Sequence, residues 1–491
     1  MRPIHVVSLA LGAVTLLAAA PPPKPPRFDR ASWVSDYEDL KRALERSYSH
    51  LRWFGSPESG VDLPALDRRT KDALARATTE QEATAAFDAF IGAFHDGHLI
   101  RKPSASAPVP PLPEPAKVTS FVDGPTACAA LGYLPSTRVS FSLPFESLPG
   151  FTLVTDGLSE AFRSGVIDVG GTRVGVVRIP RFRAGEFPAV CLQAFTRARG
   201  GRDAGVSTEE LGRGVDAAWL DALARRLELF RKRGVKVVVV DLGGNGGGND
   251  LGDWAVRAFT PAPIQSASLL VVASDAGTPY LEKELADLNA ALASDAGWNA
   301  PTRAVLERER TAFEVRLGAA REPCDLGWVW KERRPWAQAG CRRLVEAAYF
   351  SGPLGHLDAG VLDARAADTL FWATAAEPVR GAWSGPVWVL TDEKTASSAE
   401  AFTTLMRDRG VARVIGAHTL GAGCGFMNDV ESIVLPRTKL TFGAPNCVRL
   451  RDDGTDDVAG VTPDVPVLPL PGESGRARAW RALELLVDGG T

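Results

Sequence analysis

The chain lacks a concentration of charge of either sign. Its 491 residues include 56 basic and 59 acidic ones, for a net charge of −3, and no block of five or more like charges occurs. A nucleic-acid-binding protein needs a basic stripe that displaces counterions, so this class is excluded. Long apolar runs are also scarce, because only one occurs, which excludes a polytopic membrane protein. Hydrophobic residues make up 45% and charged residues 23%, as in ordinary globular proteins.

The one long apolar run lies at the N-terminus. Arg2 precedes an apolar stretch from Val6 to Ala20 that ends in three alanines. About 15 residues are too few for a spanning helix, which needs about 20. The pattern therefore predicts a secretory signal peptide over residues 1–20, with a membrane anchor as the alternative. A proline-rich tether at 21–30 follows. We expect a secreted or periplasmic protein without stable membrane insertion after signal cleavage.

Cysteines are few, and none forms a C-x-x-C pair, so the sequence gives little support to a zinc or redox site. Export would place the six cysteines in an oxidising compartment, where an even number predicts disulfides. Buried free thiols are the alternative for some of them. Proximity along the chain favours two pairs and leaves a third, namely Cys324–Cys341, Cys424–Cys447 and Cys128–Cys191.

The N-terminal third divides into three segments. Residues 31–100 predict a helical domain, because Trp33, Tyr37, Leu40 and Leu44 recur at helical spacing. Prolines mark residues 101–117 as a linker. Weak alternation over 118–169 predicts a small β-rich segment, in which we find no clear carboxylate-binding loop of the kind a PDZ domain has.

From residue 170 strands alternate with helices, which predicts an α/β core over 170–470. Residues 235–240 form a nearly continuous apolar run that ends at Asp241, as a strand buried on both faces does. Residues 269–273, 387–390 and 411–415 repeat the pattern. A helix-rich insertion is expected at 275–365, and a C-terminal helix within 471–491.

A glycine-rich turn, Gly243–Gly248, follows the strand that ends at Asp241. Glycines there let backbone N–H groups point at an anion or oxyanion. No Gly-Lys-Ser/Thr follows, so a phosphate loop has little support. A tight strand–helix turn is the plain alternative.

A second strand–turn–helix junction carries Ser397 and Ser398. A serine at such a helix N-terminus lies where the helix dipole favours developing negative charge. The next backbone N–H is then well placed as an oxyanion donor. Either serine could instead simply cap the helix.

Together these two segments resemble the C-terminal processing peptidases, the tail-specific serine proteases that include the tricorn core. In that family a strand ending Asp-Leu-Arg-x-Asn-x-Gly-Gly precedes a Ser-x-Ser-x-x-Glu nucleophile turn. Here both occur in order, with Gly243 in place of the usual arginine. Val414–Gly421 and Gly460–Val465 are similar to the family's Val-Gly-x-x-Thr-x-Gly and Gly-Val-x-Pro-Asp motifs. The resemblance implies a ClpP/crotonase-like layered α/β core and includes Asp96-Gly97-His98 at the end of the helical domain.

The resemblance also implies roles for individual residues. The family's nucleophile lies three positions before the helix glutamate, here Glu400, which indicates Ser397, with Ser398 as runner-up. The oxyanion donors would be the N–H of Ser398 and that of Gly246 or Gly247. The lysine base of the Ser/Lys branch is replaced by Ala422.

The tricorn-like branch instead takes a histidine from the end of the helical domain, which here is His98. His95 and His418 are the alternatives. That branch's carboxylate falls on Asp457, with Asp456 beside it, and would fix the imidazole tautomer. The plain alternative for this aspartate pair is a solvated turn.

These observations predict an exported serine peptidase that cleaves peptides or partly unfolded proteins through an acyl-enzyme on Ser397, with no metal or organic cofactor. An inactive ligand- or peptide-binding protein on the same fold is one alternative, and an esterase-like serine hydrolase is another. The expected partner is a peptide or protein substrate, with no nucleic acid.

Overall fold

The computed structural model describes residues 28–103, 120–134, 139–201, 205–294, 297–322, 324–333, 342–357, 370, 372–427 and 430–489. The predicted signal peptide, most of the tether and linker, and Cys341 lie outside these ranges. Within them, no helix is long and apolar enough to cross a membrane.

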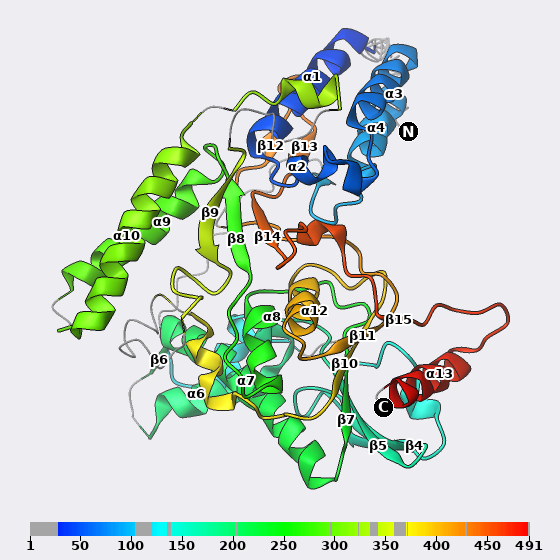
Figure 1. Cartoon of the computed structure of the whole chain (residues 1–491), viewed down its shortest axis with the longest axis vertical. Coiled ribbons are helices and arrows are strands. Elements are labelled where there is room, and N and C mark those ends of the chain that lie inside the picture. The colour runs from blue at the N-terminus through cyan, green and yellow to red at the C-terminus, as the bar shows by residue number, and fades with distance from the viewer. Residues whose placement is uncertain are drawn as a thin grey trace, which may run out of the picture.

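A seven-stranded sheet forms one end of the molecule, in the order β15-β11-β10-β7-β5-β4-β3 (Figure 1). Neighbours from β15 to β5 pair in parallel, whereas β4 is antiparallel to both β5 and β3. The predicted α/β core is confirmed. The strands are β3 (Thr152–Thr155), β4 (Ser164–Val169), β5 (Thr172–Arg178), β7 (Val237–Asp241), β10 (Val387–Thr391), β11 (Arg413–Gly416) and β15 (Val465–Pro466).

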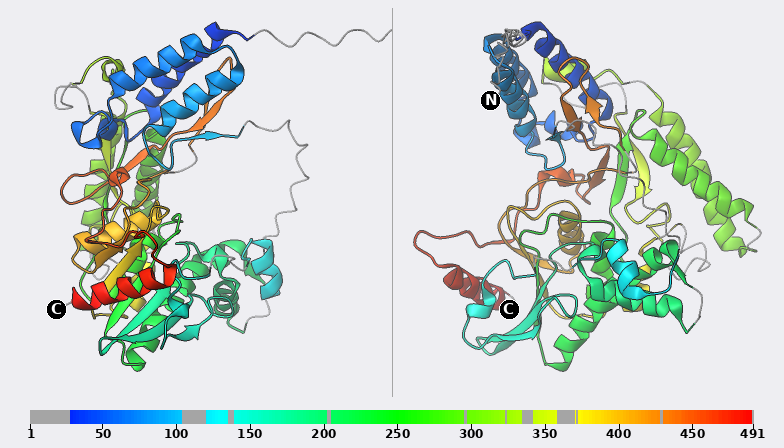
Figure 2. Two further views of the ribbon diagram at one scale, coloured as in Figure 1. Left: turned by 90° about the vertical axis from the view of Figure 1, so that its right-hand side faces the viewer. Right: turned by 180° about the vertical axis from the view of Figure 1, so that it is seen from behind.

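Both faces of this sheet are covered, because successive side chains of a strand point to opposite sides. Val238 and Val240 belong to a core cluster shared with α7 (Thr208–Lys232) and α12 (Ser398–Asp408). Val239 belongs to the opposite cluster, which includes α13 (Gly475–Asp488). Figure 2 shows α13 lying across the sheet near the C-terminus. This two-sided burial explains why the run at 235–240 is continuously apolar.

The segment at 118–169 does not form a sheet of its own. Its strands β3 and β4 extend the central sheet, and β2 (Ser120–Phe121) pairs with β6 (Val206–Ser207). Along the chain, α5 (Gly124–Ala130) follows β2, and it packs on α6 (Pro188–Arg199). A two-stranded hairpin is marginal alone, and β4 gains burial by pairing with β5.

The N-terminal helices surround a cluster of aromatic rings. They are α1 (Arg30–Ser47), α2 (Leu51–Phe54), α3 (Leu63–Arg76) and α4 (Glu80–Gly92). The same cluster takes in Phe442 from the hairpin of β12 (Ile433–Val434) and β13 (Thr441–Gly443). β13 also pairs with β1 (Ile100–Lys102), which follows α4. The chain between α4 and β1, which includes His98, is therefore held against the C-terminal part of the core.

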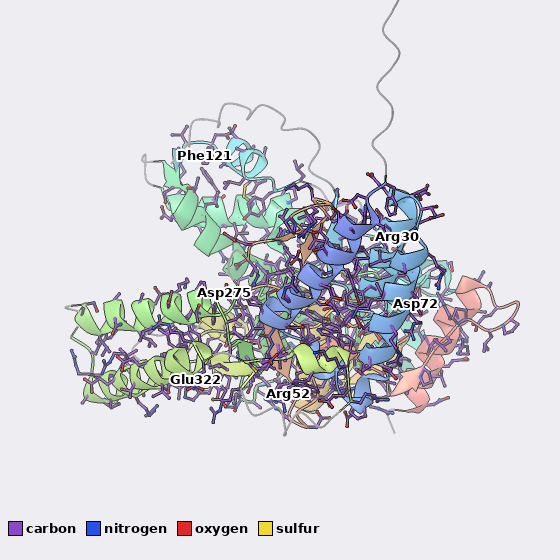
Figure 3. All side chains as sticks on the ribbon, turned by 90° about the horizontal axis from the view of Figure 1, so that it is seen from above. Arg30, Arg52, Asp72, Phe121, Asp275 and Glu322 are labelled. Carbon is purple, nitrogen blue, oxygen red and sulfur yellow. A yellow bond between two sulfur atoms is a disulfide. The ribbon has the colours of Figure 1, made fainter. Side chains whose placement is uncertain are left out.

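The predicted insertion at 275–365 contributes β9 (Leu344–Tyr349) and two long helices to a second layer of the molecule. β8 (Ser268–Val272) lies between β9 and β14 (Cys447–Leu450) in an antiparallel sheet. The helical hairpin α9 (Thr278–Ala293) and α10 (Ala300–Ala320) packs on it and projects sideways from Asp275 and Glu322, which mark its base in Figure 3. The apolar run at 269–273 forms the largely buried strand that its pattern predicts, but it joins this antiparallel sheet and not the seven-stranded one. A short apolar run does not specify which sheet it joins.

Two of the predicted disulfides are confirmed. Cys128–Cys191 joins α5 to α6, and Cys424–Cys447 joins the loop after β11 to β14. The predicted Cys324–Cys341 pair involves a residue outside the described ranges.

The Cys128–Cys191 bridge closes a loop with a sequence separation of 63. Replacing both cysteines by serine should lower the free energy of unfolding by about 4 kcal/mol, because the unfolded chain regains the loop's conformational freedom. Urea denaturation of the oxidised parent and the double variant measures the difference. Equal midpoints for the two proteins would contradict a stabilising bridge.

Candidate active site

Two turns meet at one edge of the central sheet. β7 and β10 are parallel neighbours, with Leu390 opposite Asp241, so the turns that follow them leave side by side. The N–H of Ala396 donates to the carbonyl of Asn245 at 2.9 Å. The glycine-rich turn and the serine turn, 148 or more residues apart along the chain, therefore form one surface.

Ser397 lies at the tip of the serine turn in a strained backbone conformation, with φ +57° and ψ −120°. Such conformations cost on the order of 1–3 kcal/mol and occur at functional sites, including the turns that present a nucleophilic serine. The side chain is part-exposed. Its Oγ accepts the backbone N–H of Glu400 in a capping box at the start of α12, and its hydroxyl donates to no group among the described residues.

Ser398 has the opposite environment. It is 3% exposed, and its hydroxyl donates to the carbonyl of Asn249. A hydroxyl that is buried and already bonded is poorly placed to attack a substrate. The geometry therefore favours Ser397 as the nucleophile. Ser398 keeps its predicted role as a backbone N–H donor to the oxyanion.

The glycine-rich turn approaches the serine turn so closely that position 247 requires glycine. A Cβ there would lie 2.7 Å from the Cβ of Ser397 and 2.9 Å from the N of Ser398, and φ is +95°. The N–H of Gly247 donates to Oδ1 of Asn245 at 2.8 Å. In the described part of the chain, the N–H groups of Gly246 and Ser398 have no partner. These two are the better oxyanion donors of the three that the sequence indicated.

Glu400 joins the serine turn to the turn after β11. Its buried carboxylate accepts hydrogen bonds from Ser397 N at 2.8 Å and from Thr419 Oγ1 at 2.5 Å. It also accepts from Gly421 N at 2.7 Å and Ala422 N at 2.9 Å. Burial raises the pKa of Glu400, and these donors oppose that shift by favouring the charged form.

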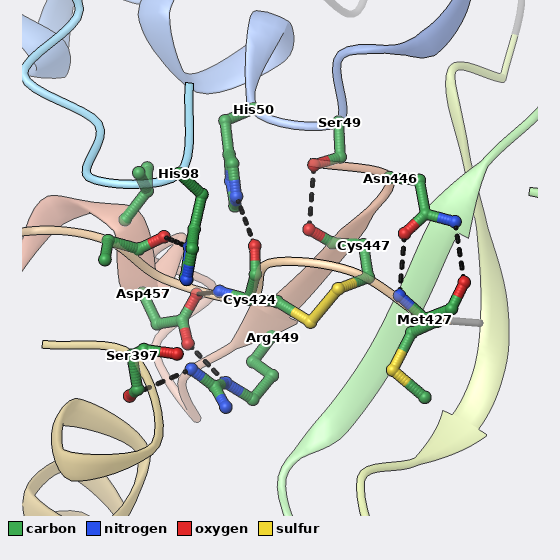
Figure 4. Close-up of a disulfide and its surroundings, with 12 residues drawn as sticks. Ser49, His50, His98, Ser397, Cys424, Met427, Asn446, Cys447, Arg449 and Asp457 are labelled. Atoms are coloured by element: carbon green, nitrogen blue, oxygen red, sulfur yellow. Dashed lines mark hydrogen bonds and ion pairs between the residues drawn. A yellow bond between two sulfur atoms is a disulfide. The ribbon is translucent and has the colours of Figure 1, made fainter. Parts of the chain in front are cut away.

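His98 reaches this turn from the helical domain. Asp96 accepts the N–H of His98 at 2.8 Å, in an Asx-type turn that sets the direction of the ring. The ring Nδ1 lies 2.7 Å from the carbonyl oxygen of Ala422. A carbonyl only accepts, so Nδ1 carries the hydrogen and Nε2 is left as an acceptor in the neutral ring. In Figure 4 the ring points toward Ser397 and Asp457.

No hydrogen bond joins His98 to Ser397 in the described structure. Catalytic hydrogen bonds are often long before substrate binds, so this does not exclude the pair. His95 is exposed, and His418 Nδ1 lies 2.7 Å from the carbonyl oxygen of Thr419. Neither alternative is hydrogen-bonded to Ser397.

Asp457 is 2% exposed, so the solvated-turn alternative was wrong for it. Its Oδ2 accepts from Arg449 Nε at 2.5 Å and its Oδ1 from Cys424 N at 3.2 Å. Asp457 and His98 share no hydrogen bond in the described part of the chain, and the backbone of Ala422 holds the imidazole instead. Arg449 also donates to the carbonyl of Ser397 at 3.4 Å.

Sequence reasoning missed Arg449 and His50. Arg449 is a charged residue within a buried strand, a pattern that could have indicated a buried partner such as Asp457. His50, fully buried, contacts Asp456, which is also buried. A lone histidine after a helix gives no comparable signal. Within the described ranges, no three His, Cys, Asp or Glu side chains lie together as metal ligands would.

Two carboxyl groups lie next to Asn249: Asp250 follows it along the chain, and Asp216 is hydrogen-bonded to its side chain. Burial raises the pKa of Asp250 to about 7, helped by repulsion from Asp253 and Asp216. Burial likewise raises the pKa of Asp216 to about 6. Both groups hold their protons more tightly in the folded protein than in the unfolded chain.

Asp250→Asn should therefore stabilise the protein at high pH. Because the folded-state pKa of Asp250 is raised, its contribution to stability is lost as the pH rises from about 4 to about 7. The free energy of unfolding of the variant should exceed that of the parent by up to about 4 kcal/mol at pH 8, and the two should be equal near pH 4. Urea denaturation at the two pH values tests this, and a variant less stable than the parent at pH 8 would contradict it.

Comparison with known proteins agrees with this geometry. Mature CPAF has a crystal structure that matches 93% of this chain and 96% of its own, with 15% identity and a TM-score of 0.53. CPAF complexed with lactacystin matches 93% and 97%, with 15% identity and a TM-score of 0.52. The photosystem II D1 C-terminal processing protease matches 90% and 94%, with 12% identity and a TM-score of 0.30. A search of curated proteins finds no match.

At such low identity the two CPAF structures show a shared fold. The stronger finding is that the model of peptidase family S41 matches residues 173–467. That stretch is more than half of the chain and contains the serine turn, the glycine-rich turn and Asp457. The chain therefore belongs to peptidase family S41 and is a serine peptidase.

Proposed function

We propose that this protein is exported and cleaves peptides or partly unfolded proteins through an acyl-enzyme on Ser397. The observation that carries the proposal is the position of Ser397 on a strained, part-exposed turn, beside the unbonded N–H groups of Ser398 and Gly246. Export is supported by the predicted signal peptide and by the two disulfides, which persist in oxidising compartments.

The geometry supports a sequence of proton transfers through His98. Ser397 Oγ attacks the substrate carbonyl carbon while its proton passes to Nε2 of His98. The N–H groups of Ser398 and Gly246 stabilise the resulting oxyanion. The imidazolium then gives its proton to the leaving amine. Water next attacks the acyl-enzyme and gives a proton to His98, which returns it to Ser397 Oγ as the acid product leaves.

Two contacts hold His98 in place during this step. Nδ1–H stays bonded to the carbonyl of Ala422, and Asp96, which is 7% exposed, accepts the backbone N–H of His98. Burial raises the pKa of Asp96, and the charges of His50 and His98 oppose that rise. We therefore assign the imidazole orientation to Ala422 and Asp96, with Asp457 holding the surrounding loop.

Ser397→Ala should abolish labelling by a fluorophosphonate probe, because the probe's phosphorus bonds to the nucleophilic oxygen. Ser398→Ala is the matched control, since it removes the neighbouring hydroxyl but keeps the backbone N–H, and it should still be labelled. Mass spectrometry of the labelled peptide identifies the site. Labelling that persists in Ser397→Ala, or that falls on Ser398 in the parent, would refute the assignment. A labelled parent that cleaves esters but no peptide library would favour the esterase alternative.

His98→Ala should lower kcat/KM on a peptide substrate by at least about a hundredfold, the usual contribution of a general base. His95→Ala and His418→Ala are the controls and should retain most activity. Parent activity should also fall at acid pH, where a protonated imidazole accepts no proton. Full turnover by His98→Ala would show that another residue is the general base.

A further inference from the structure

His50 connects the helical domain to the active-site loop. It lies before α2 and has 0% exposure. Its Nδ1 lies 2.9 Å from both carboxyl oxygens of Asp456, and its Nε2 lies 3.0 Å from the carbonyl oxygen of Cys424. Asp456 Oδ1 also accepts the N–H of Val458 at 3.1 Å. The carbonyl of Cys424 only accepts, so Nε2 carries a hydrogen, and an ionised Asp456 requires one on Nδ1 as well, which makes the ring an imidazolium paired with a carboxylate.

The charges around the ring support this form. Burial alone would lower the pKa of His50, but the carboxylates of Asp456, Asp96 and Asp457 raise it to about 9. Tyr48, whose ring is 5.9 Å from that of His50, is fully buried and donates its hydroxyl hydrogen to Asp96.

The acceptor of His50 belongs to the loop that orients His98. Ala422 N donates to Glu400, and Ala422 O accepts from His98. Two residues later, Cys424 N donates to Asp457, and Cys424 O accepts from His50. Figure 4 shows the contacts of His50 and Asp457 with Cys424 beside the Cys424–Cys447 disulfide. The neighbouring Ser49 binds the same region, since its Oγ donates to the carbonyl of Cys447 at 2.8 Å.

We propose that His50 is a positioning residue for the peptidase reaction: as an imidazolium it holds the 422–424 loop and Asp456 against the helical domain, and so keeps His98 directed at Ser397. The proposal rests on the proposed function of Ser397 and His98. Loss of the proton would leave one ring nitrogen facing an oxygen lone pair, so the loop would be held less firmly. Activity should therefore fall at alkaline pH as His50 deprotonates, with kcat affected more than KM.

Asp456→Asn tests this without changing the size of the side chain. The amide oxygen still accepts from Val458 and from a ring N–H, but the charge that favours the imidazolium is gone. The alkaline limb of kcat/KM should move from about pH 9 toward neutral by about two pH units, with kcat at pH 8 reduced about tenfold. Asp453→Asn, in the same turn but exposed, is the control and should leave the limb in place. An unmoved limb in Asp456→Asn would overturn the proposal.

A measurement that does not need activity separates this proposal from the proposed function. In ¹⁵N-histidine-labelled Ser397→Ala protein, both ring nitrogens of His50 should be protonated at pH 7.5 and titrate near pH 9. His50→Gln identifies the signal. A neutral His50 tautomer at pH 7.5 would overturn the proposal whatever the state of the nucleophile. If Ser397 proves unreactive while His50 titrates as expected, the failure lies in the proposed function.

Discussion

The arrangement of the site depends on the buried carboxylate of Glu400. It accepts four hydrogen bonds, one from the backbone of Ser397 and three from the turn at residues 419–422. A buried carboxylate is costly unless such donors surround it, so the two turns must stay together for the charge to be tolerated. Ala422, one of the donors, accepts from His98 through its carbonyl. A single carboxylate thus connects the nucleophile to the base through one residue, Ala422.

The rest of the fold supplies the elements that meet at this carboxylate. The parallel pairing of β7 and β10 places the glycine-rich turn beside the serine turn. The pairing of β1 with β13 brings the chain from the helical domain back onto the core just after His98. Buried ion pairs then join the layers: Arg449 with Asp457, and His50 with Asp456. The site is therefore built between two parts of the chain, and its geometry depends on how they pack.

Much of this could be predicted because the signals are local. Continuous apolar runs predicted β7 and β10, and the glycines after Asp241 predicted a close backbone approach. Through the family resemblance, the spacing from Ser397 to Glu400 indicated the nucleophile. The short separation of Cys424 and Cys447 predicted their disulfide, and Cys128–Cys191 followed as the remaining pair. Apart from that last pair, each of these features depends on residues close together along the chain.

Features that depend on distant contacts could not be predicted in the same way. The pattern at 269–273 indicates a buried strand but not its antiparallel sheet. The alternation around 152–169 gives no hint that β3 and β4 extend the main sheet. The partner of Asp457 is Arg449 rather than His98, and His50 becomes informative only when Asp456 is beside it. Pairing of buried charges is decided by packing.

The central claim is that Ser397 attacks the substrate with His98 as its base. A crystal structure of the fluorophosphonate-inhibited protein tests it most directly, because the adduct resembles the tetrahedral intermediate. The account predicts phosphorus bonded to Ser397 Oγ, a phosphoryl oxygen accepting from the N–H groups of Ser398 and Gly246, and His98 Nε2 as the imidazole nitrogen nearest to Ser397 Oγ. An adduct on Ser398, or His418 as the nearest imidazole, would contradict it.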